Sequence, residues 1–385
     1  MRRLLPLVLL VLIPAPSAAH ADGCPLPCSG QSSSPLGSKL LFVQPTGSRG
    51  PLVVYNTKTR KPVFRLPAGI ASADGLGYFA AKPDRGGGTI VSQYYAPTGE
   101  LINMWVKPGH WTLEAVSPAG RLFALTRRTA GTTTVRIFDL DRSAKVAHVM
   151  RLSGNYEVET ISNDGRKLFL IQHLGGKRYS VRQYDLSHER LVARPLRAAG
   201  VKLMAGYAWS GVASPDGHWL LTLYLSTARN TAFVHSLNLR KSFPACVNLP
   251  SGGGQFSKLK NYSLTLSPDS RVLFAANPTL GVLAEVDLLN SKVVRVTRFH
   301  RSPIKTNAPR AATLSTISRN SRTVYFSAGR DLWAFDAAYG RVRGPYATDG
   351  EIVGVGYGTN DRRMFAVRKD GRMLAFDAAT GERMR

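Results

Sequence analysis

Two glutamates of this chain have the residue type and the placement that a ligand-binding or catalytic site needs. Glu114 and Glu159 each lie three residues before the Ser of a recurrent turn, so they hold equivalent places in adjacent units. Trp111 and Trp209 lie a few residues ahead of turns of the same kind, and such rings can stack on a sugar. We expect these four side chains to line a shallow pocket. The alternative is that the glutamates pair with neighbouring Arg or Lys and that the rings fill the core.

Signatures of catalysis and of metal binding are absent from the sequence. Ala208-Trp-Ser-Gly211 lacks the first glycine of a G-x-S-x-G nucleophile elbow. No H-E-x-x-H or EF-hand spacing occurs, and no two His residues lie four positions apart. We therefore predict no catalytic residue, no metal and no cofactor, and we favour a binding protein over an enzyme.

The chain is strongly basic. Its 385 residues include 51 Lys and Arg against 24 Asp and Glu, a formal net charge of +27. The excess is spread along the chain without a long basic run, so a specific nucleic-acid partner is not predicted. Because a positive surface attracts anions, we expect a protein or an anionic envelope polymer as the partner. The alternative is a solvated basic surface that holds no ligand.

The first 21 residues have the three parts of a secretory signal peptide. Arg2-Arg3 is the basic region, Leu4 to Ile13 is the apolar region, and Ala19-His-Ala21 is the cleavage site. Residues 22–33 form a polar linker, and no later apolar run is long enough to cross a membrane. The sequence thus predicts a secreted or extracytoplasmic protein without a transmembrane segment.

Three cysteines follow the signal peptide, at Cys24, Cys28 and Cys246. Export permits a disulfide between two of them, either locally or from the N-terminus to Cys246. Asp22 and Ala21 depart from the pattern of a lipoprotein acylation site before Cys24. We therefore predict no lipid anchor, and the order of pairing stays open.

The candidate side chains are positioned by a repeated unit that begins with a tight turn. In Ser214-Pro-Asp-Gly217, Pro pre-sets its φ angle and Gly accepts a positive φ. Each relative of this turn precedes a short apolar run typical of a buried strand. Turns of this kind start at residues 34, 72, 117, 162, 214, 267, 318 and 358.

A second signal lies further along each unit. Asp or Asn follows an alternating strand, as in Phe138-Asp139, and folds its side chain back onto the backbone to begin a turn. Each unit therefore contains four antiparallel strands, and a period of about 40–50 residues is typical of a propeller. We predict an all-β fold in which residues 34–385 form one β-propeller of eight four-stranded blades. Seven blades is the alternative, if the N-terminal unit completes the last blade.

Two stretches resemble known propeller repeats. Residues 322–342 are similar to a YVTN-type repeat, and Ser214-Pro-Asp-Gly-His-Trp-Leu-Leu221 resembles the turn of TolB-like and WD-repeat-like proteins. The resemblance implies a propeller blade, and the families that share it include lactonases, quinoprotein dehydrogenases and interaction scaffolds. We favour an exported binding or scaffolding module. The alternative is a propeller enzyme, either a lactonase-like hydrolase or one similar to quinoprotein dehydrogenases.

The turns and the remaining loops lie on opposite faces of a propeller, which we call the turn face and the loop face. The turns hold most of the recurrent Asp residues, whereas the loops are basic. We predict the loop face as the contact surface, with Lys260 and Arg310 as binding residues. The loop cations are Arg49, Arg85, Arg127, Arg128, Lys177, Arg178, Arg229, Arg330, Arg368, Lys369, Lys107, Lys202, Lys258, Lys260, Arg301, Lys305 and Arg310.

Overall fold

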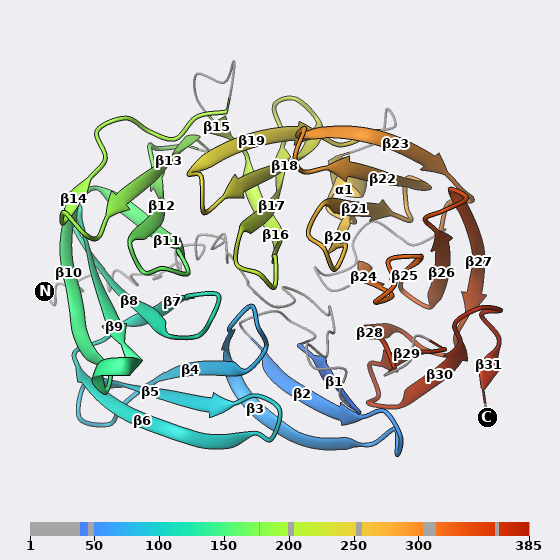
Figure 1. Cartoon of the computed structure of the whole chain (residues 1–385), viewed down its shortest axis with the longest axis horizontal. Coiled ribbons are helices and arrows are strands. Elements are labelled where there is room, and N and C mark those ends of the chain that lie inside the picture. Colours follow the sequence, from blue (N-terminus) through green and yellow to red (C-terminus); the bar gives the residue numbers. More distant parts are fainter. Residues whose placement is uncertain are drawn as a thin grey trace, which may run out of the picture.

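The computed structural model describes residues 39–44, 50–176, 178–198, 204–251, 256–302, 313–358 and 362–384. Their strands form seven hydrogen-bonded sheets that are arranged in a ring around a central axis (Figure 1). The chain is therefore an all-β propeller in which each sheet forms one blade. The predicted signal peptide, the linker, Cys24, Cys28, Arg310 and the first turn, at residues 34–37, lie outside the described residues.

The first three sheets take up the N-terminal half. The first contains β1 (Leu40–Val43), β2 (Pro51–Asn56), β3 (Pro62–Ala71), β4 (Gly77–Pro83), β5 (Gly88–Tyr95) and β6 (Glu100–Pro108). The second contains β7 (Thr112–Val116), β8 (Leu122–Thr129), β9 (Thr132–Asp139) and β10 (Lys145–Ser153), with a 3₁₀ turn at Leu140–Arg142. The third contains β11 (Asn155–Ile161), β12 (Lys167–His173), β13 (Arg178–Asp185), β14 (Arg190–Leu191) and β15 (Met204–Ala205).

The other four sheets have four strands each. The fourth contains β16 (Tyr207–Ala213), β17 (Trp219–Ser226), β18 (Thr231–Asn238) and β19 (Phe243–Asn248). The helix α1 (Phe256–Leu259) precedes the fifth, which contains β20 (Ser263–Leu266), β21 (Val272–Asn277), β22 (Val282–Asp287) and β23 (Lys292–Arg298). The sixth contains β24 (Thr313–Ile317), β25 (Thr323–Ala328), β26 (Asp331–Asp336) and β27 (Arg341–Ala347). The seventh contains β28 (Ile352–Tyr357), β29 (Arg363–Arg368), β30 (Met373–Asp377) and β31 (Arg383–Met384).

The propeller class is confirmed, but the number of blades is seven, the alternative number, instead of eight. The difference arises at β3, whose first part pairs with β2 while Gly69–Ala71 pairs with β4. The first two sequence units therefore hydrogen-bond as one six-stranded sheet. The repeat pattern could not show this, because a strand that changes partners midway keeps the same sequence signals.

The predicted Ser turns are confirmed where they are described. The Ser214 hydroxyl donates to Asp216 and accepts from the backbone N–H of His218 at 3.0 Å and of Trp219 at 2.8 Å. A Ser at the same place accepts from the residue five positions on in other units. These serines are buried, and each hydroxyl satisfies a backbone donor at the start of the following strand. Their positions are Ser72, Ser117, Ser162, Ser267 and Ser318.

Replacing Ser214 with Ala is expected to lower the free energy of unfolding by about 1–3 kcal/mol, because it leaves the backbone N–H of buried Trp219 without its acceptor. Chemical denaturation followed by tryptophan fluorescence measures this. The control is Ser187→Ala, an exposed turn serine, which should change stability by less than about 0.5 kcal/mol. Equal effects at both positions would contradict the role given to the buried hydroxyl.

The core lies between neighbouring sheets. Strand β17 is buried along its whole length, and Leu221, Leu223 and Leu225 join the cluster that packs the fourth sheet against the fifth. At the closure of the ring, Val43 of β1 packs in one cluster with Phe365 and Val367 of β29. Strands β7, β11, β16, β20, β24 and β28 lie innermost, around the axis (Figure 1). The described residues contain no helix long and apolar enough to cross a membrane.

Candidate functional site

The predicted pocket residues share a backbone feature. Glu114 in β7, Glu159 in β11 and Trp209 in β16 each lie where the register with the next strand shifts by one residue. A β-bulge of this kind bends the strand and re-aims its side chain. Three of the four predicted pocket residues thus lie at bulges of innermost strands in successive sheets. The sequence pattern contains no signal for these bulges.

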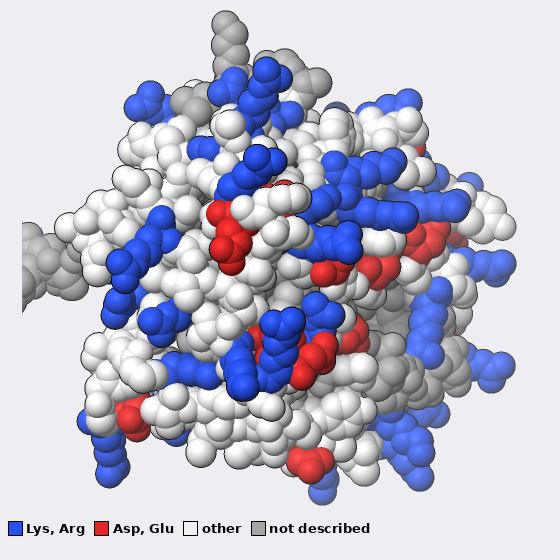
Figure 2. Space-filling model, turned by 60° about the vertical axis from the view of Figure 1, so that its left-hand side comes forward, with Lys and Arg blue, Asp and Glu red and all other residues white. Residues whose placement is uncertain are grey.

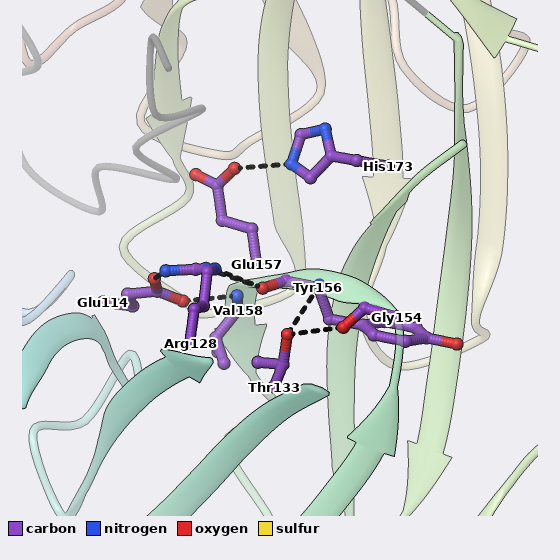
Figure 3. A network of polar contacts seen from close by, with 8 residues as sticks. All are labelled: Glu114, Arg128, Thr133, Gly154, Tyr156, Glu157, Val158 and His173. Atoms are coloured by element: carbon purple, nitrogen blue, oxygen red, sulfur yellow. Dashed lines mark hydrogen bonds and ion pairs between the residues drawn. The ribbon is translucent and has the colours of Figure 1, made fainter. Parts of the chain in front are cut away.

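Glu114 joins the second sheet to the third. One carboxylate oxygen lies 2.5 Å from Arg128 Nη1, and the other accepts the backbone N–H of Val158 at 2.8 Å. Arg128 also donates from Nε and Nη2 to the carbonyl oxygen of Tyr156, at 2.9 and 2.6 Å (Figure 3). Glu114 therefore binds a backbone N–H of strand β11, and Arg128 binds a backbone carbonyl oxygen of the same strand. We call Glu114 and Arg128 the blade clamp.

Burial dominates the electrostatics of the clamp. The side chain of Glu114 is only 5% exposed, and this burial raises the pKa of its carboxyl above the ordinary value. The charge and hydrogen bonds of Arg128 and the N–H of Val158 oppose the rise. This geometry is the alternative considered for the glutamates, because Glu114 pairs with a neighbouring Arg. A role in ligand binding stays a prediction.

The two glutamates of β11, in the third sheet, are also engaged. Glu159 is 1% exposed and accepts a hydrogen bond from Thr222 Oγ1 of the fourth sheet at 3.1 Å. Glu157 extends away from the clamp and lies 3.2 Å from His173 Nε2 (Figure 3). Glu114 and Glu159 therefore each contact the next sheet in the ring.

The two tryptophans are placed for packing. Trp111 is 8% exposed, and its indole N–H donates to the carbonyl oxygen of Pro108 at 2.7 Å. The guanidinium groups of Arg127 and Arg136 lie 4.9 and 4.5 Å from the centre of its ring. Trp209 is partly buried against the cluster between the fourth and fifth sheets. Stacking of Trp111 on a ligand would require an arginine to move.

The remaining predicted site residues are placed only in part. Lys260 is half-buried just after α1. Cys246 has no disulfide partner within the described part of the chain. The described residues hold no group of three or more His, Cys, Asp or Glu that could bind a metal ion.

The Cys246 thiol is expected to react slowly near neutral pH, because burial raises its pKa to about 11. In a Cys24→Ser/Cys28→Ser variant, alkylation by iodoacetamide should accelerate as the pH rises toward that value and the thiolate fraction grows. Mass spectrometry of quenched samples measures the rate, and the unfolded protein is the control. A native thiol as fast as the unfolded one at pH 8 would contradict the effect of burial.

The cations of the loop face divide into two groups. Loops between the two middle strands of a unit carry exposed Arg85, Arg178, Arg229 and Arg330, whereas Arg127 lies over the ring of Trp111. In the seventh sheet, by contrast, the loop cations are engaged in ion pairs. Arg368 pairs with Asp349 and Asp370, and Lys369 pairs with Glu351. Figure 2 shows Lys and Arg over much of one face, with Asp and Glu in a few groups among them.

Three hollows lined by described residues lie around the seventh sheet. The first, of about 640 Å³, holds Arg322, Arg343 and Arg362 together with the acids Asp336 and Asp377. The second, of about 490 Å³, is lined by Lys39, Lys58, Arg362, Arg363 and Asp377. The third, of about 640 Å³, is lined by Arg60, Lys61, Arg372 and Arg383. Together they hold ten cationic and two acidic residues.

Sequence reasoning missed these hollows. The predicted contact surface was the loop face, whereas the first two hollows are formed largely by turn residues such as Ser318 and Asp377. The turns were interpreted as structural because their Asp residues have a clear local role. Basic residues beside the turns of the last and first units, such as Lys58 and Arg362, were the available signal.

Comparisons with known proteins identify the fold only. No protein-family model and no curated protein matches this sequence. The solved structure of dihydro-heme d1 dehydrogenase NirN in complex with DHE has 17% identity and a TM-score of 0.56, over 92% of this chain and 73% of that one. The Dos1 propeller has 11% identity and a TM-score of 0.55, over 91% and 92%. Kuenenia stuttgartiensis hydrazine synthase has 15% identity over 84% and 97%, with a TM-score of 0.47.

Proposed function

We propose that this chain is an exported binding module for an anionic polymer of the cell envelope or the extracellular space. The observation that carries the proposal is the lining of the three hollows, where ten cations face two acids. Export rests on the signal peptide expected at residues 1–21. The YVTN-like and TolB-like character of the repeats stays a prediction, as does the enzyme alternative.

The physical basis is the attraction between converging cations and a charged chain. Like charges that line neighbouring hollows add their potentials and raise the local concentration of counter-ions. Each exposed ion pair contributes little by itself, so a ligand with many charges gains far more than a single small anion. Salt shortens the range of this attraction to about 8 Å at physiological ionic strength. Binding should therefore weaken as salt is added.

A pull-down from an envelope fraction tests the proposal. Residues 22–385 are immobilised and incubated at low salt and at about 0.15 M salt, and retained polymers are assayed for uronic acid, phosphate and protein. An unrelated basic protein of matched net charge is the control. We expect an anionic polymer that this chain retains more strongly than the control does. Equal retention by both would make the charge non-specific and would overturn the proposal.

A further inference from the structure

The three hollows are neighbours, because adjacent ones share lining residues. The first two share Arg362 and Asp377, and the second and third share Met384. They run from the turns of the sixth sheet, past the seventh sheet, to the β2–β3 turn of the first sheet. We call this row of hollows the seam groove, since its second and third hollows lie where the C-terminal sheet meets the N-terminal one (Figure 1).

The acids of the seam groove are held by the backbone. Asp336 Oδ1 accepts the N–H groups of Ala338 and Tyr339, at 3.1 and 3.2 Å. Asp377 Oδ1 accepts those of Ala379 and Thr380, at 2.8 and 2.9 Å. Both carboxylates therefore form turns of the kind expected for Asp after a strand. The cations of the groove are mostly exposed. Three of them also have local partners, since Arg372 pairs with Asp370, Arg383 pairs with Asp349, and Arg343 donates to the carbonyl oxygen of Ala379.

An aromatic ring lies beside these cations. Tyr339 lines the first hollow with Arg343 and Arg362, and it is 76% exposed. An exposed ring of this size can stack on the apolar face of a sugar, and guanidinium groups bind carboxylate or phosphate through paired hydrogen bonds. A ring beside arginines therefore favours a sugar that carries negative charge. A bare polyphosphate has no face for the ring.

The size of the groove favours a chain over a small ion. Each hollow lies within the range of about 300–1,000 Å³ that is usual for small-ligand sites. Three such hollows in series offer successive subsites for a linear polymer. We propose that the seam groove binds an anionic polysaccharide whose chain runs from the sixth sheet to the first. This inference rests on the proposed function and names its ligand class and its site.

The experiment compares two variants that lose the same charge. The groove variant is Lys58→Gln/Arg362→Gln/Arg363→Gln, and the loop variant is Arg85→Gln/Arg178→Gln/Arg229→Gln; all six residues are exposed. The probes are polygalacturonate and inorganic polyphosphate, with calorimetry at fixed salt as the measurement. Circular dichroism and thermal melts show that each variant is folded. A third variant, Tyr339→Ala, tests the ring.

The expected result is a loss of about tenfold in polygalacturonate affinity for the groove variant and about twofold or less for the loop variant. Tyr339→Ala should weaken the binding of polygalacturonate several-fold and leave the affinity for polyphosphate unchanged. Equal losses of polygalacturonate affinity in the groove and loop variants would show that the seam groove is not the binding site. The proposed function would still stand. An unchanged polygalacturonate affinity in Tyr339→Ala would overturn the assignment of a polysaccharide as the ligand. Failure of the wild-type chain to bind either polymer better than a charge-matched protein would remove the proposed function itself.

Discussion

Replacing Arg128 with Met is expected to lower the free energy of unfolding by about 2–4 kcal/mol, the largest single effect predicted for this chain. Arg128 is partly exposed, whereas Glu114 is buried. Removing the partner of a buried charge leaves that charge uncompensated, and this is strongly destabilising. Here the charge left behind is Glu114, which keeps the hydrogen bond from the N–H of Val158. The carbonyl oxygen of Tyr156 loses both of its Arg128 donors as well.

The pH dependence of this loss has a definite sign. Burial raises the pKa of Glu114, so the contribution of this carboxyl to stability is complete below its unfolded-state pKa and is lost as the pH rises through its folded-state pKa. Removing Arg128 takes away a charge that lowers the pKa, and the pKa rises further. The destabilisation should therefore be larger at about pH 8 than at about pH 5.

Urea denaturation at both pH values measures the effect of Arg128→Met. Arg85→Met is the matched control, since Arg85 is an exposed loop arginine and its loss should cost less than about 0.5 kcal/mol. Adding Glu114→Gln to Arg128→Met should recover part of the stability, because the stranded charge is gone. The clamp would not be a coupled pair if the loss in the free energy of unfolding for Arg128→Met did not change with pH. The same would follow if that loss matched the loss for the control.

Replacing Gly354 with Ala is expected to destabilise the closure of the ring by about 1–3 kcal/mol through overpacking. A Cβ at this position would lie 2.7 and 2.8 Å from the two methyl carbons of Val43. Gly354 is in β28 of the seventh sheet and Val43 is in β1 of the first, so the clash falls on the contact between the two ends of the chain. Val43 is fully buried and has little room to shift.

A compensating substitution distinguishes a steric clash with Val43 from a general loss of stability. Val43→Ala removes the methyl carbons in question and should by itself cost about 1–3 kcal/mol as a cavity. The double variant should be more stable than the sum of the two single effects predicts, by about 1 kcal/mol or more. Gly86→Ala, in an exposed loop, serves as the control. Strictly additive effects would show that the two residues do not press on each other.

The blade pattern follows from short-range chemistry, so the sequence predicts it well. A Ser hydroxyl binds backbone N–H groups four and five residues on, as at Ser214, and an Asp carboxylate binds those two and three residues on, as at Asp377. Such contacts depend on residue type and spacing alone. The all-β class and the antiparallel strands could therefore be predicted from the sequence.

The sequence by itself thus determined the propeller, its turns and the excess of positive charge. The tertiary structure decided how many sheets form, because β3 changes partners between β2 and β4. It also decided that Glu114 binds Arg128 and a neighbouring strand, and that Lys58 and Arg362, far apart in the chain, line one hollow. The physical reason is that these contacts join different strands or different sheets, so their geometry exists only once the strands have paired and the ring has closed.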